Sequence, residues 1–320
     1  MNREQQGQAE SSIAHWVAPL TVDEFFRDYW EQRPVHLRGA PERGTSLLSS
    51  QELMAALVDN PVLPGRLFLS PQGWGEAQPD LQRLTRDERA ARLQAYFDNG
   101  YPLLWNSARA ASAPVARACA ELAQALQAKV WPNVYATSAS GTPFDFHFDA
   151  HEVLAVQCAG RKTWQISHLR ADRPLEEEEM GPVVAQALAQ ARGPAREQLW
   201  MEFTVEPGDA VYIPRGQFHN AYTPEGRSLH VTFALRPACG YDLVQTLRTL
   251  ALGNPLLRDF LPPPALDPDG AHGRERLAQM RAALHALLDS ETLTREMNSA
   301  HAALVARGNK GTAMLDDRGT

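Results

Sequence analysis

Short β-type segments recur between turn residues from Trp131 to Pro237, and this pattern constrains the fold more strongly than any other feature. Each segment is rich in β-branched and aromatic residues, and turn-forming residues separate it from the next. Such a density of short strands predicts a sandwich or a barrel. The stretch VLAVQCAGRKTWQIS further predicts a hairpin that turns near Ala159 and Gly160. The predicted strands are NVYAT, FDFHF, VLAVQ, TWQIS, MEFTV, AVYIP, HNAYT and LHVTFAL.

Helical patterns flank this β-rich region on both sides. Thr21 and one of Ser49 and Ser50 are predicted N-caps of helices that precede it, and further helical patterns follow Pro237. The acidic run Glu176–Glu179 is expected to be a solvated loop or helix face. The predicted divisions are a disordered tail at 1–20, a mixed helical and strand region at 21–130, the β core at 131–237 and a helical region at 238–320.

Composition and charge indicate which broad class of protein this chain belongs to. The chain has 320 residues, of which 44% are hydrophobic, so it can bury a substantial core. Its net charge of −7 does not indicate a broad basic surface, and no nucleic-acid partner is expected. The N-terminus is polar and no apolar run reaches the roughly 18 residues of a membrane span, so we expect a soluble protein. Cys119, Cys158 and Cys239 form neither a disulfide framework nor a zinc motif, which favours a reducing, cytoplasmic setting.

Three separated residues carry the strongest chemical signal. His147 and Asp149 are two positions apart, and on an extended strand they would point to the same face. His219 follows a turn and a strand, and it would converge with them if the two strands lie side by side. Two histidines and one carboxylate form the facial triad of non-haem Fe(II) oxygenases, which leaves other metal positions open. The sequence therefore predicts a metal site.

Other histidines compete for this role. A lone histidine is more often a surface or hydrogen-bonded core group than a ligand. His151 would share the strand face of His147 and Asp149, although its position favours the rim of the site. His168 is a further candidate. His230 lies in the alternating segment SLHVTFAL, where a hydrogen-bonded core or sheet-face histidine is the simpler interpretation.

The spacing around the triad is similar to the two signature motifs of the cupin superfamily. The first segment has Gly141 separated by five residues from the His-x-Asp pair, and the second has Gly208, Pro214 and Gly216 before His219. The second motif usually ends on Asn, and Thr223 stands there in this chain. More specifically, residues 20–240 resemble the JmjC-type cupin oxygenases of the ribosomal oxygenase branch. The resemblance rests on FFRDYWEQRPVHLRG, NVYAT, HFDAHEVLAVQCAGRKTW, PGDAVYIPRGQFHNA and SLHVTF.

The resemblance implies a double-stranded β-helix barrel of the cupin, jelly-roll type, mainly β, with N-terminal helical decoration and a C-terminal helical region. It implies Fe(II), 2-oxoglutarate and O2 as cofactor and co-substrates, with iron on the predicted triad. Lys162 would pair with the far carboxylate of 2-oxoglutarate, whereas its neighbour Arg161 would face away. The other implied pocket residues are Tyr135, Asn133 and Thr232, with Asn220 a weaker candidate and Trp164 a core residue.

The implied activity is hydroxylation of a protein or peptide side chain, with a ribosomal protein among the possible substrates. Alternatives are oxidation of a small molecule or biosynthetic peptide, demethylation, and a non-oxidative metal-binding cupin that could recruit Glu152 as an extra ligand. The roughly 80 residues after Pro237 suffice for dimerisation helices but are short for a winged helix. The segment YDLVQTLRTLALGN has a wide apolar stripe, which either packs on its own chain or forms a homodimer; the resemblance favours the homodimer. The stripe comprises Leu243, Val244, Leu247, Leu250 and Leu252.

Overall fold

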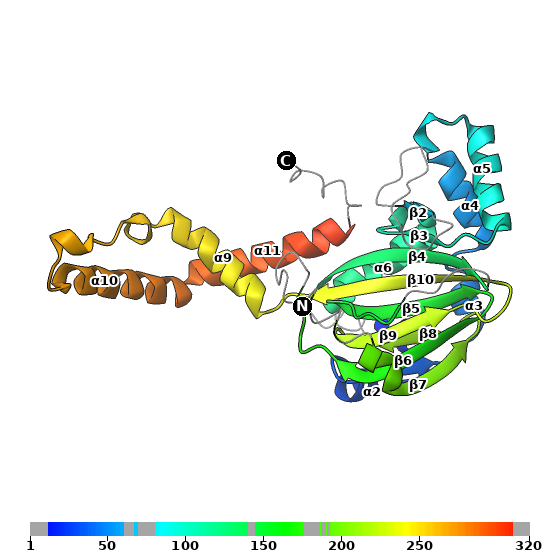
Figure 1. Ribbon diagram of the computed structural model, residues 1–320, viewed down its shortest axis with the longest axis horizontal. Helices are drawn as coiled ribbons and strands as arrows, with labels where there is room; N and C mark the ends of the chain where they lie inside the picture. The colour runs from blue at the N-terminus through cyan, green and yellow to red at the C-terminus, as the bar shows by residue number, and fades with distance from the viewer. Residues whose placement is uncertain are drawn as a thin grey trace. The chain divides into compact units, whose positions relative to one another are not determined.

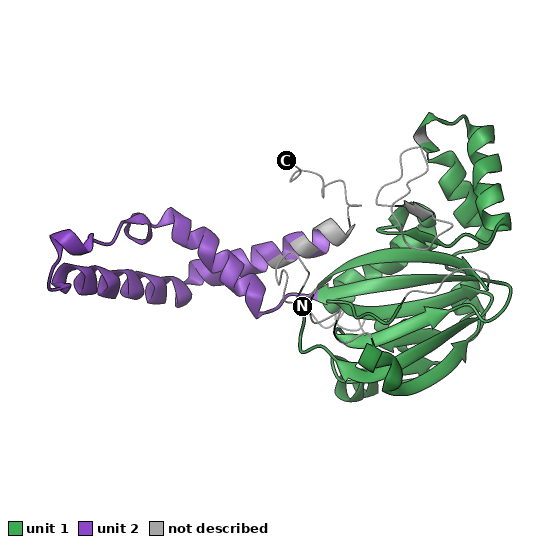
Figure 2. Ribbon diagram, viewed as in Figure 1, with its two compact units in different colours: residues 1–236, 307–320 green, residues 237–306 purple. Residues whose placement is uncertain are grey.

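The chain divides into two compact units, residues 1–236 with 307–320 and residues 237–306 (Figure 2). The computed structural model describes residues 12–60, 67–69, 81–139, 145–175, 186, 190 and 193–309. Gly141 and the acidic run at 176–179 therefore lie outside the described residues. No helix of the described part combines the length and apolarity that crossing a membrane requires.

Unit 1 is mainly β with helices, as predicted (Figure 1). The larger sheet has the order β1-β8-β5-β10-β4-β3-β2, and the smaller sheet has the order β7-β6-β9. These hydrogen-bonded ladders do not close into a barrel among the described strands. The strands are β1 (Val35–Leu37), β2 (Leu67–Leu69), β3 (Leu103–Trp105), β4 (Ala128–Ser138), β5 (Glu152–Ala159), β6 (Lys162–Arg170), β7 (Leu199–Val205), β8 (Ala210–Ile213), β9 (Gln217–Tyr222) and β10 (Arg227–Pro237).

The predicted hairpin between β5 and β6 is wrong. The turn lies at Gly160 as expected, but β5 pairs with β8 and β10 whereas β6 pairs with β7 and β9 in the other sheet. Gly160 has φ +63°, and a Cβ there would lie 1.8 Å from the carbonyl oxygen of Arg227. Glycine therefore allows the backbone to approach the start of β10 closely where the chain crosses from one sheet to the other.

The space between the two sheets holds an apolar core. Side chains alternate along each strand, so every second residue of β5, β6 and β8 faces this interior. Both sheets contribute, and partly buried side chains of β7 and β9 complete the packing. The buried members are Val153, Ala155, Trp164, Ile166, Val205, Val211 and Ile213.

Helices cover the β region and lie before it in the chain. They are α2 (Val22–Asp28), α3 (Glu42–Thr45), α4 (Ser50–Asp59), α5 (Arg86–Asp98) and α6 (Ala113–Leu126). Residues 12–17, expected to belong to the disordered tail, are helical and bury Ile13, Trp16 and Val17. The Trp16 ring packs on Phe233 of β10 with centroids 5.6 Å apart. Hydrophobic burial therefore orders the end of the predicted tail that lies nearest the sheet.

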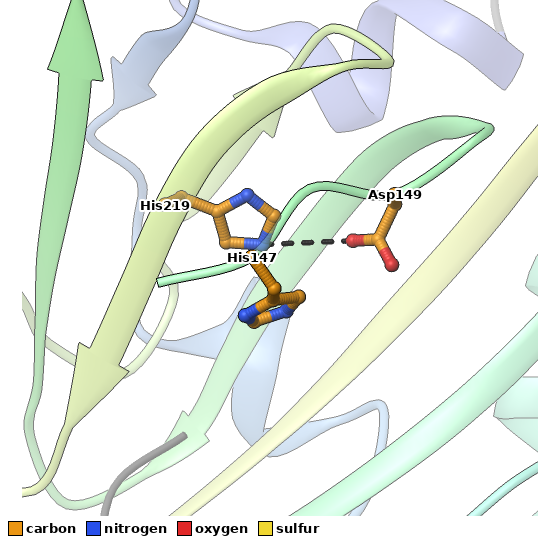
Figure 3. A group of neighbouring side chains, drawn as sticks. All are labelled: His147, Asp149 and His219. Atoms are coloured by element: carbon orange, nitrogen blue, oxygen red, sulfur yellow. Dashed lines mark ion pairs between the residues drawn. The ribbon is translucent and has the colours of Figure 1, made fainter. Parts of the chain in front are cut away.

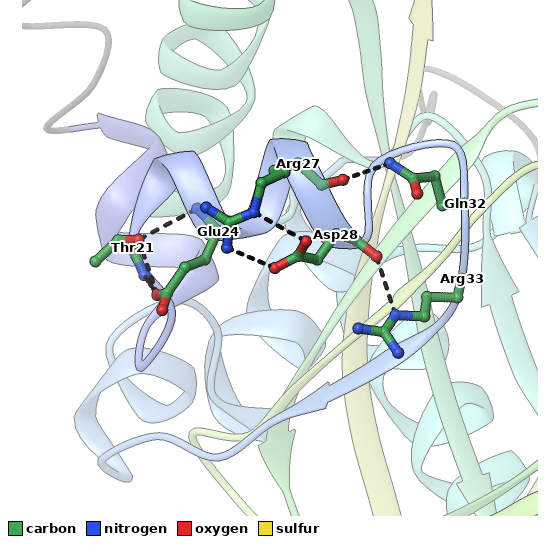
Figure 4. A network of polar contacts seen from close by, with 6 residues as sticks. All are labelled: Thr21, Glu24, Arg27, Asp28, Gln32 and Arg33. Atoms are coloured by element: carbon green, nitrogen blue, oxygen red, sulfur yellow. Dashed lines mark hydrogen bonds and ion pairs between the residues drawn. The ribbon is translucent and has the colours of Figure 1, made fainter.

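Helix α2 begins after Thr21, as predicted. Glu24 N donates to Thr21 Oγ1 at 3.2 Å, and Thr21 N donates to the Glu24 carboxylate at 2.9 Å, which completes a capping box. After the helix, the side chains of Gln32 and Arg33 donate to backbone carbonyls of its last turn (Figure 4). These bonds fix the path of the chain into β1, which pairs with β8. Ser49 caps α4 in the same way.

A buried polar cluster fastens this N-terminal segment to the turn before β8. Asp209 accepts hydrogen bonds from His36 Nε2 at 2.8 Å, Gly39 N at 3.1 Å and Glu206 N at 3.2 Å. Arg43 donates to the Gly208 carbonyl at 2.6 Å and to the Leu37 carbonyl at 2.7 Å. The cluster therefore holds β1 against the strand that leads to the second half of the candidate site.

Unit 2 is a helical unit with few buried side chains. It contains α9 (Gly240–Gly253) and α10 (Ala271–Leu288), and α11 (Glu291–Asn309) begins in it. These are the helical patterns predicted after Pro237. Short 3-10 turns follow α9 at Pro255–Arg258 and Pro264–Leu266. Neither α9 nor α10 has a buried residue.

Replacing Asp209 tests the polar cluster. Asp209→Ala removes the acceptor of three buried or partly buried donors, so we expect the free energy of unfolding to fall by about 2 to 4 kcal/mol. Urea unfolding measures this. Asp98→Ala breaks an exposed ion pair with Arg227 and should cost less than about 1 kcal/mol. Equal losses in the two variants would contradict the structural role of Asp209.

Candidate active site

His147, Asp149 and His219 converge at one end of the space between the sheets. Each offers one potential ligand atom, and these atoms all lie within 4.8 Å of one another. His219 Nε2 is 3.5 Å from Asp149 Oδ2, and the two imidazole centroids are 4.5 Å apart (Figure 3). Among the described residues, this is the only group of three with geometry suited to a metal ion. The predicted convergence is therefore confirmed.

The backbone brings the three residues together differently from the prediction. The expected strand FDFHF is wrong over its described part, residues 145–148, where only an isolated bridge forms. His147 N donates to His219 O at 3.0 Å, and His219 N donates to His147 O at 2.8 Å. Gly216 N donates to Asp149 O at 2.8 Å. Local pairing with β9 and its preceding turn thus replaces a regular strand.

Backbone carbonyls orient both imidazoles. Nδ1 of His219 lies 2.9 Å from the Gln217 carbonyl oxygen, and Nδ1 of His147 lies 2.9 Å from the Asp145 carbonyl oxygen. These contacts assign the ring proton to Nδ1 in each residue and leave an Nε2 lone pair. Burial, and then the neighbouring His147, lower the pKa of His219 to about 4. His219 is therefore neutral at physiological pH, as a metal-binding imidazole must be.

Asp149 is the charged member of the group. Burial raises the pKa of its carboxyl, but the nearby imidazoles of His151, His219 and His147 outweigh burial and hold the pKa below its usual range. His151 Nε2 lies 3.8 Å from Asp149 Oδ1, and its ring packs edge-on against Trp131. His151 thus lies beside the site, at the rim position predicted for it.

Lys162 is buried in the same interior. Its side chain is 3% exposed, whereas the neighbouring Arg161 is at the surface and pairs with Glu206 and Glu225. Lys162 Nζ donates to Thr137 Oγ1 at 2.7 Å, and no carboxylate of the described residues forms an ion pair with it. Burial lowers the pKa of Lys162 to about 7. A buried ammonium without an anionic partner is a strong recognition element for an anion.

Aromatic rings connect the triad to Lys162. Trp164 lies between two histidines, with its ring centroid 6.0 Å from that of His219 and 5.7 Å from that of His230. The Tyr135 ring stacks on His230 at 4.6 Å with an interplanar angle of 4°. Burial raises the pKa of Tyr135, and the charge of Asp149 raises it further. Tyr135 and His230 therefore line the path from the triad to Lys162.

The two other predicted pocket residues, Thr232 and Asn133, are both buried. Thr232 is buried two residues after His230, on the same face of β10. Asn133 is buried two residues before Tyr135 on β4, and its Oδ1 accepts from Ser107 N at 3.1 Å. Trp164 belongs to the apolar core, as predicted.

Several candidates lie outside this group. His168 is exposed and stacks on Trp200. Asn220 alternates with His219 on β9, and its Nδ2 donates to Gln165 Oε1 at 3.3 Å. Glu152 accepts hydrogen bonds from Tyr212 Oη and Arg215 N, so its two oxygens are used away from the triad.

Thr137 and Thr223 are pocket residues that the sequence argument missed. Thr137 Oγ1 lies 2.7 Å from both Lys162 Nζ and Thr223 Oγ1. The signal for Thr137 was available, because it continues the i, i+2 series of Asn133 and Tyr135 on β4. Thr223 was noted only as a departure from the usual Asn, and here its hydroxyl joins the Lys162 network.

Comparison with known proteins agrees with this architecture. Residues 104–243 match the family model described as the JmjC domain. The curated relatives include the bifunctional lysine-specific demethylase and histidyl-hydroxylase NO66 of Drosophila persimilis, which is 25% identical over 75% of this chain. They also include ribosomal oxygenase 1 of Gallus gallus, 29% identical over 69% of this chain. Residues 104–243 thus carry a JmjC domain, and the chain is similar to proteins of the ribosomal oxygenase type.

The chain spans about a third of the length of these two relatives, 34% and 36% respectively. Among solved structures, the Escherichia coli ribosomal oxygenase YcfD in complex with cobalt and 2-oxoglutarate aligns with a TM-score of 0.52. The alignment covers 88% of this chain and 71% of that one at 16% identity, so it shows a shared fold. A second YcfD structure aligns with a TM-score of 0.51.

The buried ammonium predicts pH-dependent binding of 2-oxoglutarate. Lys162 pairs with a carboxylate only when protonated, and its pKa of about 7 means that protonation is lost as pH rises above about 7. The dissociation constant should therefore rise from about pH 7 to about pH 9. Lys162→Ala should raise the KM for 2-oxoglutarate at least about tenfold.

Titration of the metal-loaded protein at several pH values measures this dependence. Lys162→Arg is the control, because a guanidinium stays charged over the whole range and should flatten the profile. An unchanged KM for 2-oxoglutarate in the Lys162→Ala variant would show that Lys162 does not bind this co-substrate.

Proposed function

We propose that this chain is an Fe(II)- and 2-oxoglutarate-dependent hydroxylase that acts on a protein or peptide side chain. The observation that carries this proposal is the juxtaposition of a two-histidine, one-carboxylate cluster with a buried Lys162 inside one β-rich interior, where no carboxylate of the described residues pairs with this lysine. Neither feature alone is specific. A metal site with three protein ligands and a nearby cation for a second carboxylate suits a metal-chelating dicarboxylate co-substrate.

The donor set fits Fe(II). His147, Asp149 and His219 would hold the metal through two neutral imidazoles and one carboxylate, a set that leaves positions for co-substrate and O2. The carbonyls of Gln217 and Asp145 already orient the rings, so little reorganisation is needed on binding.

The pocket fits the co-substrate. Lys162 would bind the far carboxylate of 2-oxoglutarate, and Tyr135 would donate its hydroxyl to that carboxylate. The pKa of Tyr135 is raised, so the phenol keeps its proton and remains a donor. Thr137, already bonded to Lys162, would hold the ammonium in place, and Asn133 and Thr232 would complete the polar wall.

The chain's own contribution is positioning and exclusion of water. When bound, Fe(II) with 2-oxoglutarate and O2 supplies the oxidation of an unactivated C–H bond, with release of succinate and CO2. Trp164, Ile166 and Val153 form an apolar wall that keeps water from the interior. The two sheets would form the walls of a double-stranded β-helix, so the mainly β fold described above would be of this type.

The substrate class rests on the relatives. NO66 is named as a lysine-specific demethylase and histidyl-hydroxylase, and the YcfD and chicken proteins are named as ribosomal oxygenases. We therefore favour a protein substrate, with a ribosomal protein as the first to test. The alternatives are demethylation and oxidation of a small molecule or biosynthetic peptide. A non-oxidative cupin is disfavoured because Glu152, its candidate extra ligand, is bonded to Tyr212 and Arg215.

We propose a cytoplasmic setting without a nucleic-acid partner, supported by the composition and by the described cysteines. Cys119, Cys158 and Cys239 are all free thiols, which suits a reducing compartment such as the cytoplasm. The acidic net charge of −7 offers no support for a nucleic-acid partner.

A mass-shift experiment tests the function. The protein is incubated with host lysate and Fe(II), with and without 2-oxoglutarate, and peptides that gain one oxygen are identified by mass spectrometry. Wild type should produce them only with 2-oxoglutarate, and Asp149→Ala should produce none while remaining folded, because one metal ligand is lost. Asp172→Ala, an exposed aspartate, is the matched control and should behave as wild type. Identical peptides from wild type and Asp149→Ala would contradict the proposal.

Unit 2 supplies a prediction about assembly. Its helices and the segments between them leave large apolar side chains exposed within the described residues, more than a soluble monomer usually shows. We propose that a second copy covers them through α9 in a homodimer. Leu247→Glu should then lower both stability and activity, whereas Gln245→Glu adds the same charge at an exposed position and should be tolerated. The exposed apolar residues are Val244, Leu252, Phe260, Leu261, Leu266, Leu277, Leu284 and Leu288.

Light scattering at micromolar concentration measures the mass. The homodimer is supported if wild type has the mass of a dimer and the Leu247→Glu variant has the mass of a monomer. A monomer mass for wild type contradicts it.

A further inference from the structure

His230 is a buried histidine with an unsatisfied ring nitrogen. Its side chain is 3% exposed, and Nδ1 has no hydrogen-bond partner. The alternating segment around His230 predicts a hydrogen-bonded core histidine, and for Nδ1 that expectation is wrong. Leaving a buried polar atom unpaired costs free energy, so its persistence at this position calls for a partner that arrives with a ligand.

The neighbours of His230 do not supply a partner for Nδ1. Tyr135 stacks flat against one face of the ring, which leaves the ring edge free to point elsewhere. Gln157 lies opposite on β5, but its Nε2 donates to Ala159 O at 2.8 Å, Gly160 O at 3.2 Å and Ser228 Oγ at 2.9 Å. The acceptor of that side chain, Gln157 Oε1, is also buried without a hydrogen-bond partner, so it does not accept the Nδ1–H of His230.

His230 also belongs to the polar part of the interior. Trp164 lies edge-on to it and also contacts His219, so His230 is on the triad side of the core. Burial, and then the charge of Lys162, lower the pKa of His230 well below its usual value. The imidazole is therefore neutral and can offer one N–H to an anion that Lys162 attracts.

We propose that His230 is a further binding residue for the co-substrate, with Nδ1–H donating to the far carboxylate of 2-oxoglutarate beside Lys162. This inference rests on the proposed function. Lys162 would supply charge and His230 a directional hydrogen bond, so together they would discriminate 2-oxo acids that carry a second carboxylate from those that lack it. The natural comparison ligand is 2-oxopentanoate, which keeps the 2-oxo acid end and the chain length but lacks that carboxylate.

Two variants of His230 separate hydrogen bonding from packing. His230→Leu keeps a similar volume and removes the N–H, whereas His230→Asn keeps an amide N–H close to the position of Nδ1. His168→Leu is the control, because His168 is an exposed histidine stacked on Trp200. The readouts are the dissociation constants of 2-oxoglutarate and 2-oxopentanoate for the Mn(II)-loaded full chain, and the Tm of the metal-free protein.

We expect His230→Leu to weaken 2-oxoglutarate binding about tenfold. Its affinity for 2-oxopentanoate should stay within about twofold of wild type, and His230→Asn should recover most of the 2-oxoglutarate affinity. The Tm of metal-free His230→Leu should equal or exceed that of wild type, because an unpaired buried nitrogen is removed.

Three results would overturn the inference. Wild-type affinity for 2-oxoglutarate in His230→Leu would show that Nδ1 makes no bond to it. Equal losses for both 2-oxo acids, with a lowered Tm, would show that His230 is a packing residue only. If wild type itself binds Mn(II) but not 2-oxoglutarate, the proposed function fails and this inference fails with it.

Discussion

The candidate site depends on one short piece of backbone pairing. His147 and His219 exchange two hydrogen bonds of 3.0 and 2.8 Å, although no regular strand surrounds His147. This bridge joins an irregular segment to the edge strand β9, and Gly216 N extends it by donating to Asp149 O. The spacing of three ligand atoms within 4.8 Å follows from these bonds. Preorganisation of this kind lets weak individual groups bind a metal tightly.

The interior between the sheets is divided into an apolar part and a polar part. Val153, Ile166 and Ile213 belong to a core that stabilises the fold through burial. Lys162 and His230 belong to the polar part, where burial of a cation and of an unpaired nitrogen both oppose folding. Proteins tolerate such groups where a ligand later satisfies them. Lys162 and His230 lower the stability of the ligand-free chain, and they therefore mark the part of the interior where a ligand would bind.

The sequence predicted much of this because some patterns depend only on local geometry. The β-rich texture and the capping residue Thr21 follow from alternation and from local hydrogen bonding. Alternation places only one of Arg161 and Lys162 in the interior, and the resemblance favoured Lys162, which is the buried one. The assignment of each strand to one of the two sheets does not follow from local geometry. The segments β5 and β6 have hairpin-like spacing, yet Gly160 directs them into different sheets, which is a tertiary outcome. The network of Thr137 and Thr223 likewise joins strands that only the fold brings together.

The central claim is that one site holds both the metal and 2-oxoglutarate, and anaerobic absorption spectroscopy tests it most directly. Fe(II) chelated by a 2-oxo acid absorbs visible light, whereas neither component alone does so appreciably. Wild type loaded with Fe(II) should develop this band on addition of one equivalent of 2-oxoglutarate per chain. Binding of Fe(II) with no band at saturating 2-oxoglutarate would contradict the account, because the metal and the co-substrate would then not share a site.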